Sequence, residues 1–464
     1  MKENVGKPKE LWKVLKSIGL PQKSFSTANI CLKTKEKISF DTKENAETFK
    51  DFFNNLAEDL VKKLPKAPNV FGDSSTSLYY RSKELPTKDF DFSNVSVTTV
   101  TNILHNMDPS KASGIDNLSG KFIKDGASVL ALPIAQICNL SIKTSCFPSD
   151  CKIAKLKPIF KKGTITDPKN YRPISLLPLL SKVIEKVVHD QTQDFLSENK
   201  LLFEYQSGFR TNHSTEFALT FLSDKILQGF DNGLLTGMIL IDLQKAFDTI
   251  DHEILFQKMV QIKFSKEVIS WFKCYLSNRT FLVSINDKLS NRGYLKCGVP
   301  QGSILGPLLF LLYVNDMKQA IKSDLLLYAD DSCILYQHKE VKVIEKRLNE
   351  DFSSLCDWFV DNKLSIHFGE DKTKSILFAS KKKVKSAGKL CIKYNDINIK
   401  QYSNVCYLGC ILNNTFSGDS MALKVIGKVN SRLRFLYRNS SVLSPALKRM
   451  LCNALIQPLL IMRP

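Results

Sequence analysis

The chain has 464 residues, of which 43% are hydrophobic, so it is expected to fold into roughly two to four subdomains and is not disordered. Its formal net charge of +20 is typical of proteins that bind polyanions, such as nucleic acids or anionic membranes. The most apolar window, residues 304–314, is shorter than the roughly 20 residues of a membrane span and contains Gly306 and Pro307. We therefore expect no contact with a membrane.

The twelve cysteines show neither a C-x-x-C pair nor the spacing of zinc ligands. Cys406 and Cys410 flank the sequence "YLG" and are interpreted as buried thiols. The first fifteen residues lack the apolar core of a secretory signal. These features favour a reducing, intracellular location, in the cytoplasm or the nucleus.

Residues 1–95 read as an N-terminal helical and linker region. A short amphipathic stretch covers residues 10–20, and a helical pattern covers residues 45–64. The loop at residues 65–77 is rich in Pro, Ser and Gly and is the best candidate for a domain boundary. From about residue 95 to about 415, helix-like and strand-like segments alternate.

The segment 236–255, "TGMILIDLQKAFDTIDHEIL", predicts an apolar strand over Met238–Ile241 that runs directly into Asp242. An acid at the end of so apolar a strand favours a functional interpretation. The residues that follow predict a helix start with Asp248 as N-cap and Asp251 at the third helical position. For Asp248, a capping role is therefore favoured over a ligand role.

The segment 298–316, "GVPQGSILGPLLFLLYVND", predicts a loop punctuated by Gly298, Gly302 and Gly306 that leads into an apolar helix. Such a loop lets the backbone approach a ligand closely, and a helix start offers unpaired N–H groups. Loops with Gly and Pro are common, so this pattern alone does not define a site.

The segment 325–336, "LLLYADDSCILY", predicts a β-hairpin with strands at Leu325–Tyr328 and Cys333–Tyr336 and a turn over Ala329–Ser332. The adjacent carboxylates of Asp330 and Asp331 would repel each other unless a cation neutralises them. Mg²⁺ prefers one or two carboxylates together with substrate phosphates. Two such ions, about 3.5–4 Å apart, are a standard device for in-line displacement at phosphorus. That chemistry needs a further carboxylate, which Asp242 can supply.

The C-terminal region predicts basic helices over residues 421–439 and 444–460, the second starting at Ser444 and Pro445. The final residues, "ALIQPLLIMRP", stop inside an apolar pattern. This pattern is typical of a truncated product or of a partial reading frame.

Taken together, "IDLQKAFD", "GVPQGSILGP" and "YADD" resemble the reverse transcriptases of non-LTR retrotransposons of the LINE type, similar to jockey or CR1 elements. The resemblance covers roughly residues 100–440. Further blocks extend it: "KASGIDNLSGKFIK", "FPSDCKIAKLKPIFKKG", "NYRPISLLPLLSKVIEKVV", "QSGFR", "DKTKSILF" and "YLGCIL".

This resemblance implies an α+β fold with the right-hand architecture of a polymerase: fingers, a palm with an antiparallel sheet, and a helical thumb. The implied organisation is fingers and the start of the reverse transcriptase domain over residues 96–235, palm and primer-grip hairpin over 236–415, and a partial thumb over 416–464. The reverse transcriptase domain as a whole would cover about residues 140–415.

The implied activity is RNA-directed DNA polymerisation, with an RNA template, a DNA primer and deoxynucleoside triphosphates as partners. Asp242, Asp330 and Asp331 would be catalytic and would hold two Mg²⁺ ions. Phe247 matches the ring beneath the sugar, where it would exclude a ribose 2′-hydroxyl; ordinary core packing is the alternative. Lys372 resembles a general acid near the pyrophosphate, although a solvated lysine is the more common interpretation.

The remaining implied contacts involve the triphosphate, the template and the primer. Basic residues in the fingers would contact the triphosphate, with a solvated basic loop as the alternative, and a glycine loop would lie against the nucleotide. The "QSGFR" block would contact the template strand, "YLG" would hold the primer, and the thumb helix would contact phosphates. The triphosphate contacts are Lys161, Lys162 and Arg172, and the glycine loop contains Gln301 and Gly302. The template contacts are Gln206, Gly208 and Arg210, and the primer contacts are Tyr407, Leu408 and Gly409. The phosphate contacts of the thumb helix are Lys424, Lys428, Arg432, Arg434 and Arg438.

Several other interpretations compete with this one. The block "KAFDTIDHEIL" favours LINE-type elements over a group II intron maturase, and "YADD" with Phe247 disfavours a viral RNA-dependent RNA polymerase. A catalytically inactive, RNA-binding relic remains an alternative, whereas a basic structural or membrane-surface protein has only the charge in its favour. His367 stands where relatives are expected to have Asn. No endonuclease, ribonuclease H or zinc-knuckle signature is found. These gaps bear on target cleavage and on the mobility of the element, and not on the polymerase core.

Overall fold

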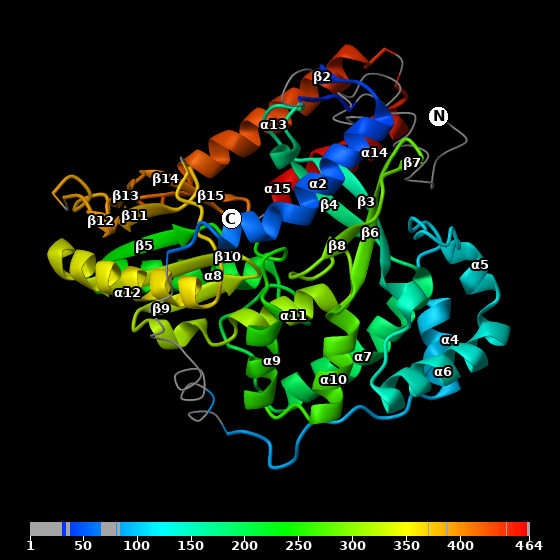
Figure 1. The fold of residues 1–464 in the computed structure, drawn as a ribbon. Helices are drawn as coiled ribbons and strands as arrows, with labels where there is room; N and C mark the ends of the chain where they lie inside the picture. The colour runs from blue at the N-terminus through cyan, green and yellow to red at the C-terminus, as the bar shows by residue number, and fades with distance from the viewer. Residues whose placement is uncertain are drawn as a thin grey trace. The chain divides into compact units, whose positions relative to one another are not determined.

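A computed structural model describes residues 30–33, 38–65, 80, 84–369, 371–386, 388–441 and 443–461. The chain divides into two compact units: unit 1 comprises residues 1–59, 92–190 and 270–306, and unit 2 comprises 60–91, 191–269 and 307–464. Figure 1 shows the helices and strands described below. The amphipathic stretch at 10–20 and nearly all of the predicted loop at 65–77 lie outside the described residues. The helix predicted for 45–64 is present as α2 (Thr42–Val61). The domain boundaries given above stay predictions.

Unit 1 is built on a five-stranded sheet in which β4, β3, β6 and β7 are neighbours in that order and β8 also pairs with β6. Burial alternates along much of β3 because one face of the sheet packs against α2, where Phe49 and Phe53 share a core with Leu156 and Phe281. The strands are β3 (Ile153–Phe160), β4 (Tyr171–Leu176), β6 (Arg279–Ile285), β7 (Lys288–Leu289) and β8 (Gly293–Leu295). A separate pair joins β1 (Leu32–Lys33) to β2 (Ile38–Ser39).

The other elements that begin in unit 1 are α4 (Val97–His105), α5 (Gly120–Asp125), α6 (Ala127–Thr144), α7 (Leu179–Glu198) and the 3₁₀ turns η3 (Ser149–Lys152) and η4 (Pro168–Asn170). Ser96 and Ser119 are N-caps of α4 and α5, because each side chain accepts a hydrogen bond from a backbone N–H in the first turn. Among the described helices, α6 alone has the length and apolar composition that would allow it to cross a membrane. Core helices can pass the same test, so the expected lack of membrane contact stays a prediction.

Unit 2 is built on a four-stranded antiparallel sheet, the β5 sheet, in the order β11-β5-β10-β9. Its strands are β5 (Leu235–Ile241), β9 (Asp324–Tyr328), β10 (Asp331–His338) and β11 (Lys374–Phe378). Every residue of β5 is buried, because helices cover both faces of the sheet. Leu222 of α8 (Thr215–Asp231) shares a core with Met238, whereas α12 (Val341–Asp361) runs along the sheet (Figure 1) and approaches Gly237 on the other face.

Two further hairpins follow the β5 sheet in the chain, β12 (Ile392–Tyr394) with β13 (Ile397–Ile399) and β14 (Asn404–Tyr407) with β15 (Cys410–Asn413). The predicted helix at 421–439 is confirmed as α13 (Asp419–Arg438), whereas the one predicted over 444–460 is divided at Ile456 into α14 (Pro445–Leu455) and α15 (Gln457–Ile461). The remaining elements are α9 (His252–Gln261), α10 (Lys266–Leu276), α11 (Leu305–Val314) and the 3₁₀ turn η5 (Met317–Ala320). The predicted α+β class is confirmed.

A buried ion pair in unit 2 joins α9 to Asp316, which follows α11 and precedes η5. The ammonium of Lys258 lies 2.7 Å from Asp316 Oδ1, and the two side chains are 3% and 0% exposed. Lys258 also donates to the carbonyl of Tyr313 and lies 4.7 Å from the centre of the Trp358 ring. Burial lowers the pKa of Lys258, and the charge of Asp316 opposes this shift.

We predict that Lys258→Met will destabilise unit 2 by about 3–5 kcal/mol, because it leaves the buried Asp316 carboxylate without its cation. The measurement is the free energy of unfolding from urea titration. Lys342→Met is the matched control, because the Lys342–Glu345 pair is exposed at the lysine (87%) and such pairs contribute at most about 1 kcal/mol. Equal costs for the two variants would contradict a role of the buried pair in holding these helices.

Candidate active site

The register of the β5 sheet places two of the predicted acids next to each other. Ile241, the last residue of β5, is opposite Ser332 of β10. The next residues outward along the two strands are Asp242 and Asp331. Side chains alternate along a strand, so both acids leave the sheet on the same face as Leu240 and Cys333.

Asp330 lies in the turn that joins β9 to β10. The prediction of a turn over Ala329–Ser332 was wrong in length, because Asp331 already pairs with Tyr328 and only Ala329 and Asp330 are unpaired. Ser332 continues the ladder because its partner on the central strand, Ile241, extends the pairing to that point. Ala329 takes a left-handed backbone with φ of 55°, which is uncommon for a residue other than glycine.

The exposure of the acids explains how the chain tolerates two adjacent carboxylates. Asp330 and Asp331 are exposed, and the Asp242 side chain is 32% exposed, so water can solvate all three. Within the described part of the chain, no three Asp, Glu, His or Cys side chains already form a group that would hold a metal ion. Asp242 Oδ2 pairs with the ammonium of Lys372 at 2.8 Å.

The segment 365–373 lies along the residues that follow β5. The His367 N–H donates to the Asp242 carbonyl at 2.8 Å, and the Gln244 N–H donates to the Ser365 carbonyl at 2.8 Å. The Thr373 hydroxyl accepts from the Asp242 N–H at 3.4 Å. These backbone contacts hold Lys372 within reach of Asp242, which the sequence pattern did not predict.

Phe247 is held by two other rings of unit 2. Its ring stacks on Phe310 with centroids 4.7 Å apart and meets Phe209 edge-on at 6.0 Å. The side chain is half-buried, so one part of the ring packs on the core while another part stays accessible. Both predicted roles, a ring beneath the sugar and core packing, are compatible with this position.

The predicted cap at Asp248 was wrong. The N-cap of α9 is Asp251, whose side chain accepts from the Ile254 N–H and also pairs with Lys363 at 2.5 Å. The helix starts later because residues 245–248 form a separate turn, in which the Asp248 N–H donates to the Lys245 carbonyl.

The predicted template residues Gln206, Gly208 and Arg210 lie in a loop beside β9. Gln206 is 3% exposed, and its side-chain oxygen accepts from the backbone N–H groups of Gly208 and Ala329. Arg210 Nη1 donates to the carbonyls of Phe203, Glu204 and Gln206. Burial lowers the pKa of Arg210. These side chains are therefore engaged within the protein, and contact with a template stays a prediction.

The predicted primer grip is the turn of the β14–β15 hairpin. Leu408 and Gly409 occupy the turn with φ of 46° and 87°, a pattern typical of a tight hairpin. The Tyr407 side chain is buried in the core beneath the β5 sheet, where burial raises the pKa of its phenol. Cys410 is buried, whereas Cys406 is exposed, so the prediction of burial was wrong for Cys406, which lies at an exposed position of the hairpin edge.

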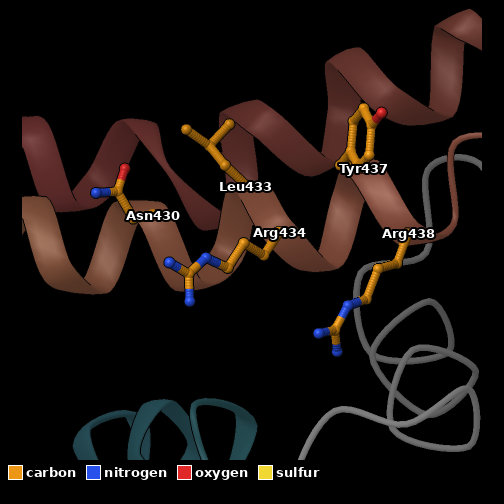
Figure 2. A pocket seen from close by; sticks show the side chains of 5 residues that line it. All are labelled: Asn430, Leu433, Arg434, Tyr437 and Arg438. Atoms are coloured by element: carbon orange, nitrogen blue, oxygen red, sulfur yellow. The ribbon is translucent and has the colours of Figure 1, made fainter.

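The predicted thumb contacts lie on α13. Asn430, Leu433, Arg434, Tyr437 and Arg438 line a shallow pocket, and Figure 2 shows Arg434 and Arg438 extending to the same side of the helix. Arg432 donates to the Leu455 carbonyl, so it also fastens α13 to α14. Lys424 donates to the Gly409 carbonyl at 3.3 Å. Lys428 is exposed on the same helix.

The other predicted nucleotide contacts belong to unit 1. Arg172 is exposed on β4, and Lys161 and Lys162 are exposed at the turn between β3 and β4. The loop with Gln301 and Gly302 lies against β4, because the Gln301 carbonyl accepts from the Ser175 N–H at 2.8 Å. The predicted nucleotide-binding residues therefore form two groups, one in each unit.

Glu185 supports the loop that leads into α11, and the sequence pattern did not predict this role. The Glu185 carboxylate, fully buried on α7, accepts from the Ile304 N–H at 2.7 Å and from the Ser181 hydroxyl at 2.8 Å. Burial raises the pKa of Glu185. Glu185 thus holds the start of α11, and an acid within the apolar pattern "LLSKVIEKVV" was the signal that could have revealed it.

A strand end and a neighbouring hairpin that present carboxylates define a candidate site for metal-dependent phosphoryl transfer. Residues 159–412, more than half of the chain, match the family model described as reverse transcriptase (RNA-dependent DNA polymerase). The chain belongs to this reverse transcriptase family.

Three relatives from Drosophila melanogaster place the chain among non-LTR retrotransposon polymerases. It is 32% identical to the probable RNA-directed DNA polymerase from transposon BS over 57% of this chain and 30% of the relative. It is 27% identical to the probable RNA-directed DNA polymerase from transposon X-element, over 72% of this chain and 36% of the relative. It is 29% identical to the RNA-directed DNA polymerase from mobile element jockey, over 62% of this chain and 32% of the relative. The predicted family is confirmed, and the chain spans about a third of the length of these relatives.

We predict that Gly302→Ala will displace the glycine loop from β4. Gly302 has φ of 112°, and a Cβ atom there would lie 2.7 Å from the Ser175 carbonyl oxygen. The expected cost is about 1–3 kcal/mol, and the Ser175 N–H should exchange faster with deuterium because it loses the Gln301 carbonyl. Gly388→Ala is the control, with φ of 77° and open space around the Cβ position. Unchanged exchange at Ser175 would show that the loop accommodates the methyl group.

Proposed function

We propose that this chain is the polymerase part of a non-LTR retrotransposon reverse transcriptase and extends a DNA primer on an RNA template with deoxynucleoside triphosphates. The observation that carries this proposal is the register that sets Asp242 beside the Asp330–Asp331 turn, in a chain of the reverse transcriptase family. In this proposal, residues 96–235 are the fingers, 236–415 the palm and 416–464 part of the thumb. An intracellular site of action, cytoplasmic or nuclear, belongs to the same proposal.

Asp242, Asp330 and Asp331 would hold two Mg²⁺ ions. Their fit to Mg²⁺ rests on donor chemistry: all three supply carboxylate oxygens, and their exposure leaves room for water and phosphate oxygens. When bound, such ions lower the pKa of the attacking hydroxyl and offset the charge of the leaving pyrophosphate. The carboxylates of this chain supply the negative charge and the spacing that position them.

Lys372 would donate a proton to the leaving pyrophosphate. Its ammonium is already held at the catalytic end of β5 by the ion pair with Asp242. A flexible lysine can exchange one anionic partner for another without moving its backbone. This supports the general-acid role, because the proton donor stands beside the carboxylates that would hold the reacting phosphates.

The remaining residues would bind and orient the substrates. Arg172 suits bidentate phosphate binding, with Lys161 and Lys162 nearby on the same hairpin. Gln301 and Gly302 would lie against the nucleotide. The turn at Leu408 and Gly409, in which Gly409 is exposed and Leu408 is partly buried, would hold the primer. Lys428, Arg432 and Arg434 would contact phosphates without reading sequence. Template contact by Gly208 and Arg210 stays a prediction.

The first test is primer extension on an RNA template with Mg²⁺ and deoxynucleotides. We expect extension by the parent chain and a loss of at least about 100-fold in Asp330→Asn, with RNA binding retained, because the substitution removes one ligand charge. Asp324→Asn, at the opposite end of the same hairpin, is the matched control and should extend normally. If neither parent nor variant extends while both bind RNA in a salt-sensitive way, the chain is an inactive RNA-binding relic.

The second test addresses the choice of sugar. Phe247→Val removes the ring that would meet a ribose 2′-hydroxyl, so the preference for deoxynucleotides over ribonucleotides should fall by about 10- to 100-fold. The measurement is the ratio of kcat/KM for the two nucleotide types. Phe217→Val, at an exposed position on α8, is the control. An unchanged ratio in an active Phe247→Val enzyme would mean that Phe247 only packs on Phe310.

A further inference from the structure

The loop that carries "QSGFR" adds a short parallel segment to the outer edge of the β5 sheet. The Ser207 N–H donates to the Leu327 carbonyl at 2.8 Å, and the Leu327 N–H donates to the Tyr205 carbonyl at 3.0 Å. β9 is the edge strand of the sheet, and Gln206 forms an isolated parallel bridge with Leu327. The loop is therefore bonded to the strand that leads into the Asp330–Asp331 turn.

The side chain of Gln206 reaches the turn itself. Its oxygen accepts from the Ala329 N–H at 3.0 Å and from the Gly208 N–H at 2.8 Å, so one carboxamide ties the loop to the turn. Ala329 is the residue in the left-handed conformation, and Asp330 follows it directly. The bond to Gln206 therefore acts on the peptide that sets the direction of Asp330.

Gly208 fits the same arrangement. A Cβ atom at this position would lie 2.1 Å from the backbone nitrogen of Ala329, which no side chain tolerates. The loop itself is anchored at its start, because the buried Asn315 side chain accepts from the Phe203 N–H at 2.7 Å, and Arg210 closes it on its own carbonyls. Close approach of the two backbones is thus built into the sequence "QSG".

We propose that Gln206 is a positioning residue that holds the Asp330–Asp331 turn in its catalytic geometry, and that its side chain does not contact the template. This inference rests on the proposed polymerase function. The Gln206 side chain is 3% exposed, and its oxygen is occupied by two backbone donors, so the surface it offers to an RNA strand is minimal. A shift of about 1 Å in a catalytic group can lower the rate about 100-fold. Loss of the hydrogen bond from the Ala329 N–H to Gln206 would therefore reduce the rate of extension.

The decisive variant is Gln206→Met, which keeps the size of the side chain and removes its acceptor. We expect kcat for primer extension to fall about 10- to 100-fold and the Mg²⁺ concentration for half-maximal rate to rise, with template–primer affinity within about twofold of the parent. A residue that merely supports the fold would not change the Mg²⁺ dependence. Gln228→Met, at an exposed position on α8, is the matched control and should behave as the parent.

A second measurement does not depend on activity. Hydrogen–deuterium exchange of the peptide covering residues 325–336 should show the Ala329 amide exchanging at least about 10-fold faster in Gln206→Met than in the parent, because its acceptor is lost. Gly208→Ala, which pushes the two backbones apart while keeping Gln206, should give the same acceleration. Exchange at Ala329 can be measured even if the parent does not extend a primer. The inference about Gln206 can therefore be tested separately from the proposed function.

Two results would overturn the inference. One is weaker template binding in Gln206→Met with an unchanged saturating kcat, which would make Gln206 a template contact. The other is unchanged exchange at Ala329, which would show that the turn holds its geometry without the carboxamide.

Discussion

The arrangement of the candidate site depends on one constraint, the antiparallel register between β5 and β10. β5 is the second strand of the sheet, is buried along its whole length and carries no charge. A slip of one residue would turn Met238 and Leu240 away from the α8 core and would also separate Asp242 from Asp331. The hydrophobic core and the pairing of the acids are therefore specified by the same alternation of side chains.

The parts of this arrangement that sequence predicts are those with strong local patterns. An apolar run that ends in Asp242, a hairpin around two adjacent acids and the basic C-terminal helices each follow from residues close together in the chain. The resemblance to reverse transcriptases then supplies the roles that periodicity cannot. Local patterns were less reliable at boundaries: the turn at Ala329 is two residues shorter than predicted, and α9 begins after Asp251.

The missed features share a different cause, which is contact between residues distant in sequence. Gln206 is buried against Ala329, Tyr407 enters the core with Cys333, and Glu185 binds the start of α11. Gln206 and Tyr407 look like surface positions in their own segments, whereas Glu185 interrupts an apolar pattern that indicates burial but not the partner. The partner of each residue depends on which distant segments the fold brings together, and no window of a single sequence contains that information.

The charge of the chain imposes a further requirement on the proposed chemistry. A net charge of +20 attracts polyanions over the surface as a whole, whereas the site itself presents three carboxylates at one end of the β5 sheet, where Asp242 is paired with Lys372. Phosphates that approach this edge meet like charge, which repels them unless a cation lies between phosphate and carboxylate. Lysine and arginine elsewhere on the chain cannot serve this purpose, because screening confines their influence to about 10 Å. Under the proposed function, the acids are thus useful only together with divalent cations, and the register that sets Asp242 beside Asp331 keeps these carboxylates within reach of the same ions.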